Sequence, residues 1–582
     1  MRTASRGPHG RSDDGNGPYR PLPPPDRDPI LTVSSLSPTS PVFQCEKDGR
    51  RHAYRFPWRN FTDLLQHRAS ERQDQPAVIF RDVDSGARTE TTYAELDALT
   101  GRLASTLHHN HGIYPGDRVA LALSNTLEIP LLTLALFRLG ATSVPLDLKR
   151  DVPDRKRYKV SDAGVKLVCA LPEAVEEEQE VLPDVPVVAT TDLLATASGS
   201  PADLEADWAE DAASQQATNV VLYTSGTTGN PKGALLTRQS LASNAHGIIR
   251  WLEFDETDRL SLVLPLHHVN STVFSLTMMM TGGTLILNSR YSTHAFWPVL
   301  VEERATASSI VPTIMHDLLS LEPKPPVDEL GHVRKIMIGS APVPSGAACR
   351  FVDTFGVRLV QGYGTTEVSL RVTGVPPGLE DRTYRHLLEA NSIGRELACN
   401  NLRIDGDPAE GELGEILVRG PVVSGGYLNQ PDATDEAFGG GWFRTGDIGC
   451  WKNHDGERYY FIHGRAKEII IKGGVNISPI AVENALVEAV DDVEAAYVVG
   501  LPSERFGEDV CAAIVLKADV ADVERRSREI RDLAADGGID ALSSYEAPAE
   551  IVPIQPEALP KTSTGKVQRS VLRDTLANRV TG

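Results

Sequence analysis

The sequence is short of several features that mark particular classes of protein. Its 582 residues include six cysteines, with no C-x-x-C pair and no cysteine–histidine spacing typical of a zinc site. No apolar run approaches the ~18 residues that a membrane-spanning helix needs. The formal net charge is −21, which argues against the clustered basic surface of a nucleic-acid-binding protein. The composition therefore favours a cytoplasmic protein with reduced thiols, no membrane span and no nucleic-acid partner.

The length of the chain predicts more than one domain, because single cores rarely grow beyond ~250–300 residues. With 41% hydrophobic and 24% charged residues, the composition is that of an ordinary globular protein. Residues 1–45 differ from the rest, since they are rich in proline, glycine, serine and arginine, including P-L-P-P-P at Pro21 to Pro25. Such a segment buries too little apolar surface to offset its ordering entropy, and we expect a disordered leader.

Short β-rich runs alternate with amphipathic helical patterns from Phe56 onward, which predicts an α/β fold of helix-covered parallel sheets. Thr92 and Glu95 have the spacing of a capping box at the start of a helix. Gly411 to Gly420 and Trp442 to Phe461 are expected to be strand-and-turn segments of a more β-rich subdomain. After Gly464 comes a small α+β domain, with a helix expected at Pro479 to Ala489. Active sites in such sheets lie where strands end in loops.

One such loop follows the apolar run that ends at Tyr223. The stretch from Val221 to Gly233 reads V-L-Y-T-S-G-T-T-G-N-P-K-G. It lacks the Gly-Lys-Ser/Thr ending of a Walker loop. Its glycines allow the backbone to approach a ligand, while its hydroxyls and single cation suit an anion. The candidate phosphate-binding residues are Thr224, Ser225, Gly226, Thr227, Thr228, Gly229 and Lys232.

Three further stretches carry residues suited to nucleotide chemistry. Tyr363-Gly364-Thr365-Thr366-Glu367 offers an aromatic face, hydroxyls and a carboxylate that could bind Mg²⁺. In G-W-F-R-T-G-D-I-G, Asp447 lies between glycines, where a carboxylate can accept ribose hydroxyls. In L-P-K-T-S-T-G-K-V-Q-R, Lys566 follows Gly565 near the C-terminus. Taken singly, each stretch also fits an ordinary turn.

Together and in this order, these motifs resemble the adenylate-forming superfamily of acyl-CoA synthetases, luciferases and peptide-synthetase adenylation domains. The resemblance covers roughly residues 50 to 575. It implies an N-terminal AMP-binding domain over 46–466 and a mobile C-terminal domain over 467–582. It also implies a two-step reaction, in which a carboxylate attacks the α-phosphate of ATP to give an acyl-adenylate and pyrophosphate, and a thiol then displaces AMP. ATP, Mg²⁺ and coenzyme A, or the phosphopantetheine of a carrier protein, are the cofactors implied.

The resemblance also assigns roles to individual residues. Thr224 to Lys232 would hold the pyrophosphate end of ATP, Tyr363 would stack on adenine, and Thr366 would touch the α-phosphate. Glu367 would bind Mg²⁺, Asp447 would hold the ribose with Arg465 close by, and Lys566 would bridge the carboxylate and the α-phosphate. Lys467 matches the hinge about which the small domain rotates, and Gly473 and Gly474 would line the thiol channel. The remaining nucleotide-binding residues implied are Gly339, Ala341, Pro342, Gly364 and Thr365.

The acid is indicated only by the segment Pro265 to Ser271. This segment contains His267 and His268 but no carboxylate that could pair with the ammonium group of an amino acid. The lack of a carboxylate favours the acyl- or aryl-CoA ligase branch. His268 aligns with the histidine of that branch, whereas His267 replaces its aromatic gate. We expect the acyl pocket near His268, Val311, Gly339 to Pro342 and Gly362.

Three hypotheses stay open from the sequence. The enzyme is a ligase that joins a small carboxylic acid to CoA, a free-standing adenylation enzyme that loads a separate acyl carrier protein in secondary metabolism, or a diazotase-like enzyme that activates nitrite or another small anion for attack by an amine. The sequence does not indicate an oligomeric state.

Overall fold

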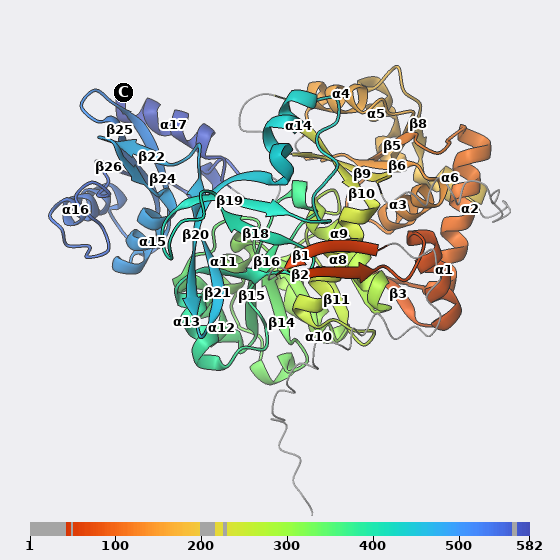
Figure 1. The fold of residues 1–582 in the computed structure, drawn as a ribbon, viewed down its shortest axis with the longest axis horizontal. Helices are drawn as coiled ribbons and strands as arrows, with labels where there is room; N and C mark the ends of the chain where they lie inside the picture. Colours follow the sequence, from red (N-terminus) through yellow and green to blue (C-terminus); the bar gives the residue numbers. More distant parts are fainter. Residues whose placement is uncertain are drawn as a thin grey trace, which may run out of the picture.

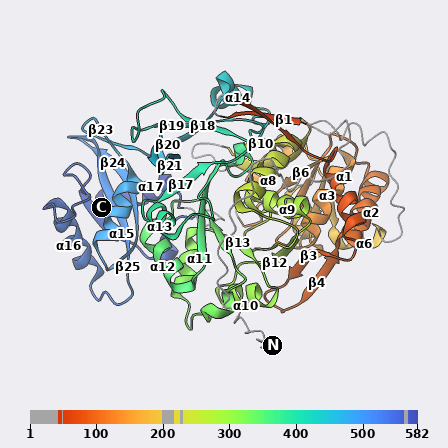
Figure 2. The ribbon, with the colours of Figure 1, turned by 60° about the horizontal axis from the view of Figure 1, so that its bottom comes forward.

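The computed structural model describes residues 42–47, 50–149, 151–197, 216–224, 230–561 and 567–581, with side chains over residues 56–579 of these ranges. Figure 1 shows a large part built from the N-terminal and central segments and a smaller part, in blue, at one end of the molecule. The view in Figure 2 agrees with this arrangement. The predicted α/β fold, with a β-rich subdomain and a small C-terminal α+β domain, is thereby confirmed.

The first sheet of the large part has six strands in the order β10-β9-β6-β5-β7-β8. All pairs except β10–β9 are parallel. The strands are β5 (Arg118–Ala122), β6 (Thr142–Pro145), β7 (Leu167–Ala170), β8 (Val187–Ala189), β9 (Thr218–Thr224) and β10 (Lys232–Thr237).

The second sheet has 13 strands, in the order β18-β19-β20-β21-β17-β16-β15-β14-β13-β11-β12-β3-β4. Strands β3 and β11 to β15 form its parallel part, and β16 to β21 form the antiparallel β-rich subdomain. The strands are β3 (Pro76–Arg81), β4 (Arg88–Thr92), β11 (Arg259–Leu262), β12 (Thr284–Asn288), β13 (Ala307–Ile310), β14 (Lys335–Ile338), β15 (Arg358–Tyr363), β16 (Thr373–Gly374), β17 (Ser392–Glu396), β18 (Asn401–Ile404), β19 (Gly414–Arg419), β20 (Phe443–His454) and β21 (Glu457–Arg465).

The C-terminal part has its own five-stranded sheet, and a separate hairpin lies near the N-terminus. The C-terminal strands are β22 (Ile470–Lys472), β23 (Val475–Ile477), β24 (Val493–Ser503), β25 (Gly507–Leu516) and β26 (Glu550–Pro553), and the hairpin is β1 (Val42–Lys47) with β2 (Arg50–Arg55). Because β21 of the large sheet leads directly into β22, the two parts are joined by the short turn that contains Lys467.

Helices cover the sheets, and their buried faces join the strands of the first two sheets in one large core. The helices are α1 (Phe61–Glu71), α2 (Tyr93–His111), α3 (Glu128–Leu139), α4 (Pro153–Asp162), α5 (Val175–Val181), α6 (Thr190–Ala197), α8 (Arg238–Leu252), α9 (Val269–Thr281), α10 (Thr293–Glu302), α11 (Pro312–Ser320), α12 (Ser345–Phe355), α13 (Asp381–Glu389), α14 (Pro431–Phe438), α15 (Pro479–Ala489), α16 (Val523–Ala535) and α17 (Arg569–Thr581).

The predicted capping box at the start of α2 is confirmed. The Thr92 backbone N–H donates to Glu95 Oε2 (2.8 Å), and the Glu95 N–H donates to Thr92 Oγ1 (3.2 Å). Two helix N–H groups that lack partners within the helix are satisfied in this way. The expected helix at Pro479 to Ala489 forms with the same bounds as α15.

The sequence pattern did not predict β10, which directly follows the phosphate loop. Lys232 is the first residue of this strand and lies opposite Thr224 in an antiparallel pair with β9. The loop therefore joins the two strands of a hairpin. Its two ends are held in register by the ladder, which fixes Lys232 beside the end of β9.

Among the described residues, five cysteines are free and buried, in agreement with the predicted reduced thiols. No helix in the described ranges is long and apolar enough to cross a membrane. The leader predicted over 1–45 lies almost wholly outside the described residues.

Candidate functional site

A large cavity lies between the carboxyl ends of β14 and β15 and the C-terminal part. It encloses about 1490 Å³ including open solvent. The structure brings most of the predicted nucleotide-binding residues to its wall, namely Gly339, Ala341, Pro342, Tyr363, Gly364, Thr365, Asp447 and Arg465. Across the cavity are residues of α15, β24 and the start of α17, including Glu483, Tyr497 and Arg569. The C-terminal part thus forms the second wall of the site.

Asp447 is held in place from two sides. The Tyr363 hydroxyl donates to Asp447 Oδ2 (2.7 Å), and Arg465 Nε lies 3.0 Å from Asp447 Oδ1. The β20–β21 ladder places Asp447 directly opposite Arg465, which explains their pairing. Burial, followed by the nearby Asp447 charge, raises the pKa of Tyr363, and the same carboxylate raises the pKa of Arg465. Asp447 is therefore an oriented acceptor on the cavity wall, with both oxygens fixed in direction.

Glu367 and Lys232 meet at Tyr427 rather than at this cavity wall. The Tyr427 hydroxyl donates to Glu367 Oε1 (3.0 Å), and Lys232 Nζ lies 4.8 Å from the centre of the Tyr427 ring. Thr224 Oγ1 donates to the Lys232 carbonyl (3.3 Å). Thr366 begins the short 3₁₀ turn that carries Glu367. Tyr427 thus joins two of the predicted motifs, although no site role was predicted for it.

Several predicted site residues lie outside the described ranges, namely Ser225, Gly226, Thr227, Thr228, Gly229 and Lys566. The chain on either side of them is described. Thr224 ends β9, and Val567, the residue after Lys566, lines the cavity. Lys561 and Val567 form an isolated antiparallel bridge, which fixes the two ends of the segment that contains Lys566.

The predicted hinge and thiol-channel residues are exposed. Lys467 lies in the turn between β21 and β22, and Gly473 and Gly474 form the turn between β22 and β23 with φ values of 58° and 86°. The structure does not bring these glycines to the cavity described above. The cavity wall contributed by the C-terminal part is instead made by α15, β24 and α17.

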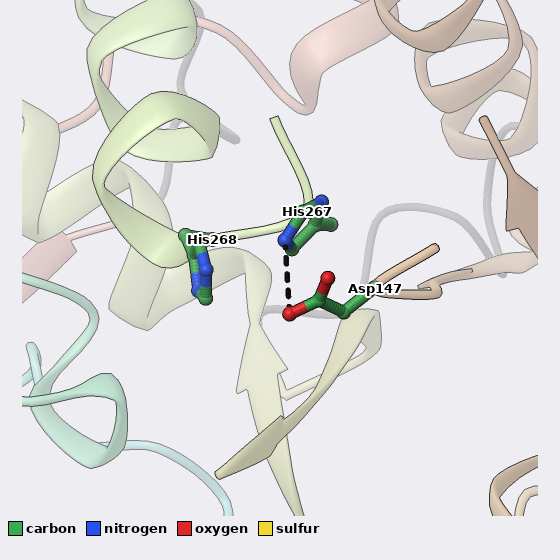
Figure 3. A group of neighbouring side chains, drawn as sticks. All are labelled: Asp147, His267 and His268. Atoms are coloured by element: carbon green, nitrogen blue, oxygen red, sulfur yellow. Dashed lines mark ion pairs between the residues drawn. The ribbon is translucent and has the colours of Figure 1, made fainter. Parts of the chain in front are cut away.

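A second group of ionisable side chains lies at the start of α9. His267 Nε2 is 3.4 Å from Asp147 Oδ2, and the rings of His267 and His268 lie 4.4 Å apart (Figure 3). One ligand atom from each of the three residues lies within 4.8 Å of the others. Two imidazoles and a carboxylate form the donor set of many zinc sites, so this cluster could hold such an ion.

Asp147 comes from a distant part of the sequence and was not predicted to approach His267. Strand β6 pairs in parallel with β9, with Ser143 opposite Val220. Asp147 lies two residues after the end of β6. The segment Pro265 to Ser271 contains no carboxylate, but the fold brings one to His267 from the chain that follows β6.

Of the remaining ionisable groups, His316 lies on the cavity wall. Burial, together with the charges of Arg350 and Lys561, lowers its pKa to about 4. His316 is therefore neutral at pH 7 and adds no charge to the site.

Family models match both parts of the chain. The model described as AMP-binding enzyme matches residues 65–428, and the model described as AMP-binding enzyme C-terminal domain matches residues 481–566. An oxalate–CoA ligase of Arabidopsis thaliana is 31% identical over 523 residues, which cover 88% of this chain and 97% of the relative.

Two solved structures show the same architecture. ATP-bound MatB from Rhodopseudomonas palustris has a TM-score of 0.77 and 27% identity, covering 89% of this chain and 99% of that one. MenE, the o-succinylbenzoate CoA synthetase of Bacillus subtilis, in complex with ATP and magnesium, has a TM-score of 0.74 and 26% identity, covering 88% and 99%. The chain belongs to the AMP-binding enzyme family and is an ATP-dependent, AMP-forming acid–thiol ligase of the adenylate-forming superfamily.

Proposed function

We propose that the protein joins a small carboxylic acid to coenzyme A. A carboxylate oxygen attacks the α-phosphorus of ATP, pyrophosphate leaves, and an acyl-adenylate forms. The CoA sulfur then attacks the acyl carbon, and AMP leaves with the oxygen that formerly belonged to the acid. The observation that carries this proposal is the cavity at the ends of β14 and β15, where Tyr363, Asp447 and Arg465 meet the C-terminal part.

The residues of the large part suit the ATP end of this reaction. Asp447, with both oxygens oriented, would accept the ribose hydroxyls, and Tyr363 would present its ring to adenine. Thr366 would contact the α-phosphate. Thr224 and Lys232, with the loop between them, would surround the pyrophosphate. Such positioning and charge neutralisation are the main requirements of a nucleotidyl transfer.

Magnesium fits Glu367, because Mg²⁺ is commonly held by one or two carboxylates together with phosphate oxygens and water. Glu367 Oε1 accepts the Tyr427 hydroxyl, which orients the carboxylate. A bound Mg²⁺ would neutralise phosphate charge during pyrophosphate release. Within the chain, Lys232 supplies positive charge next to Glu367, across the Tyr427 ring.

We further propose that the C-terminal part moves between the two steps. Val567, the residue after Lys566, lines the cavity, which supports a role for Lys566 in the first step. Rotation about Lys467 would withdraw Lys566 and bring Gly473 and Gly474 towards the same site, so that the thiol can enter. The exposed position of these two glycines fits an arrangement that precedes this rotation. Domain motions of this kind expose one set of groups in each step.

A second function, the activation of a small anion for attack by an amine, is favoured by one observation. The Asp147–His267 pair places a carboxylate and an imidazole beside the start of α9. Such a pair can take a proton from an attacking amine. Loading of a carrier protein in secondary metabolism is the other alternative. Buried free cysteines suit the reducing cytoplasm, where we place the enzyme.

A panel of acids assayed with ATP and Mg²⁺, with and without CoA, tests the proposal. We expect AMP release that depends on both acid and CoA, and an acyl-CoA thioester of the matching mass. AMP release with an acid but no thioester would contradict CoA as the acceptor. Nitrite-dependent AMP release that requires an amine would favour the second function instead.

A further inference from the structure

Arg371 is a buried cation whose charge is not neutralised by any described acidic side chain. It follows the Tyr363 to Glu367 motif and has 1% of its surface exposed. Its Nη1 donates to the Gly362 carbonyl (2.6 Å), whereas Nε and Nη2 have no hydrogen-bond partner among the described residues. Burial lowers its pKa to about 10. Arg371 therefore remains positively charged at pH 7.

The guanidinium lies against the strand ends that form the cavity wall. A Cβ atom placed on Gly339 would overlap Arg371 Nη1 and would lie 2.9 Å from Nη2. A Cβ on Gly362 would be 3.3 Å from Arg371 Cδ. Because both positions are glycine, the Arg371 side chain packs against the backbone of two residues that line the cavity, although Arg371 itself is not a lining residue. Arg371 thus borders the region where the sequence places the acyl pocket.

The chain around Arg371 is held firmly on its other side. Asn244 of α8 donates through Nδ2 to the Arg371 carbonyl (2.7 Å) and accepts the Arg371 N–H through Oδ1 (3.2 Å). Just before Arg371, Ser369 and Leu370 have φ values of 59° and 127°. Such values are rare for residues other than glycine, and they concentrate at functional sites.

A further polar group near this loop lacks a partner. Thr365 lines the cavity, and its Oγ1 is buried without a hydrogen bond among the described residues. Ser369 Oγ, on the strained turn, is also buried without a hydrogen bond among the described residues. Buried polar groups are normally satisfied by protein, water or ligand. Together with Arg371, these hydroxyls indicate that a polar group binds here.

Arg138 and Arg569, which are partly buried, are paired with acids, whereas Arg238, which is nearly as buried as Arg371, has no acidic partner among the described residues. Arg569 Nη2 lies 2.9 Å from Glu483 Oε2, and Arg569 Nε lies 3.2 Å from Glu468. Arg138 pairs with Asp97. An unpaired buried charge is costly, which is why buried charges are normally paired. An anionic ligand would supply the missing partner of Arg371.

We propose that Arg371 binds a second anionic group on the acid substrate, remote from the carboxylate that is activated. The substrate class is then a carboxylic acid with an additional carboxylate or sulfonate. This inference rests on the proposed function, which supplies the ATP end of the site. The planar guanidinium, with two N–H-bearing nitrogens still to be satisfied, suits a carboxylate or sulfonate.

Acid-dependent ATP–pyrophosphate exchange by the full-length enzyme tests the proposal with pairs of acids matched in length, such as succinate with butyrate and malonate with propionate. We expect the wild type to favour the diacid by about 10- to 100-fold in kcat/KM, as for hydrogen bonds to a charged group. Arg371→Met should lose this preference through a higher KM for the diacid, with exchange for the monoacid retained. Arg371→Gln provides a second variant should the first fail to fold.

Arg238→Met is the matched control. Arg238, the first residue of α8, is also buried, and burial lowers its pKa to about 10. Its Nε and Nη1 atoms have no hydrogen-bond partner among the described residues. Its backbone N–H donates to the Ala217 carbonyl. This variant should keep the preference for diacids. Equal use of diacids and monoacids by the wild type would overturn the inference while leaving adenylation standing. Equal loss of exchange with both acids in folded Arg371 variants would also overturn it. Absence of exchange with every acid would instead reject the proposed function, and the inference with it.

Discussion

The two sides of the site differ in how their charges are balanced. On the nucleotide side, Asp447 is paired with Arg465 and accepts the Tyr363 hydroxyl before any ligand binds. On the acid side, Arg371 has a carbonyl as its partner but no described carboxylate. The first arrangement would be preorganised for the nucleotide. The second leaves the charge to be completed by the acid, which is where members of one family can differ.

The largest effect should come from Lys566→Ala, which removes the predicted bridging charge from the nucleotide side. Because this charge would act mainly in the transition state, we expect acid-dependent pyrophosphate exchange to fall by at least about 10²-fold. Thermal unfolding should be unchanged. Lys561→Ala, at the other end of the same segment, is a suitable control, and its pyrophosphate exchange should fall much less. Unchanged exchange in Lys566→Ala would remove this lysine from the mechanism.

The next effect separates the two half-reactions. Lys467→Pro fixes φ at the predicted hinge and should hinder rotation of the C-terminal part. Pyrophosphate exchange should stay within about twofold, whereas thioester formation should fall by at least about tenfold, because only the second step needs the rotation. The two rates can be measured on one preparation. An equal loss of both would contradict a hinge at Lys467.

Asp447→Asn tests the nucleotide side alone. The amide keeps the shape of the carboxylate but loses its charge, so Arg465 and the ribose hydroxyls lose an ionised acceptor. We expect the KM for ATP to rise by about 10- to 100-fold, with the preference among acids unchanged. Asp405→Asn, which disturbs the exposed pair with Arg444 (2.7 Å), is the control. A changed acid preference would show that the two sides are not independent.

Zinc should act on the acid side through Asp147, His267 and His268. If Zn²⁺ binds this donor set, it should inhibit exchange, and Asp147→Asn should raise the inhibitory concentration by about tenfold, since loss of one ligand weakens a zinc site. Asp455→Asn provides the control, because Asp455 lies 3.3 Å from His454 on the surface. The same inhibitory Zn²⁺ concentration for the wild type, Asp147→Asn and Asp455→Asn would exclude the Asp147, His267 and His268 cluster as the zinc site.

The smallest effect concerns Lys335, a buried cation at the opposite end of β14 from Gly339. Burial lowers its pKa to about 8, below its ordinary value of 10.5. The unfolded chain therefore binds more protons between pH 8 and 10.5, so the free energy of unfolding gains a contribution that rises with pH in this window. Lys335→Met should remove that rise, worth up to about 3 kcal/mol, without changing the acid preference. Chemical unfolding of the wild type and Lys335→Met at pH 7.5 and 9.5 measures this rise. An equal change in the free energy of unfolding of the two proteins between these pH values would contradict a lowered pKa of Lys335.

Much of the fold and of the nucleotide side could be predicted from the sequence. The helix at Pro479 to Ala489 and the capping box at Thr92 depend on local patterns, which the sequence displays directly. Tyr363 and Asp447 were predicted as site residues from their motifs, and the structure brings them within hydrogen-bond distance. Their binding roles stay predictions.

The acid side could not be predicted because it depends on long-range contacts. Asp147, which follows β6, lies close to His267 although the two are far apart in the sequence, and nothing in the segment around His267 signals a carboxylate. No role was predicted for Arg371, because arginines are seldom fully buried and its sequence position does not show its burial. Strand β10 was missed for a similar reason, because its partner β9 lies across the loop that draws attention as a ligand site.

The central claim, that an oxygen of the acid is transferred to AMP, is tested most directly by isotope labelling. The wild-type enzyme is incubated with ATP, Mg²⁺, CoA and an accepted acid in which both carboxylate oxygens are ¹⁸O. The masses of the products are then measured by mass spectrometry. The account predicts one ¹⁸O atom in AMP, an acyl-CoA that retains the other, and unlabelled pyrophosphate. Unlabelled AMP, or label in a phosphate or pyrophosphate product, would contradict an acyl-adenylate intermediate.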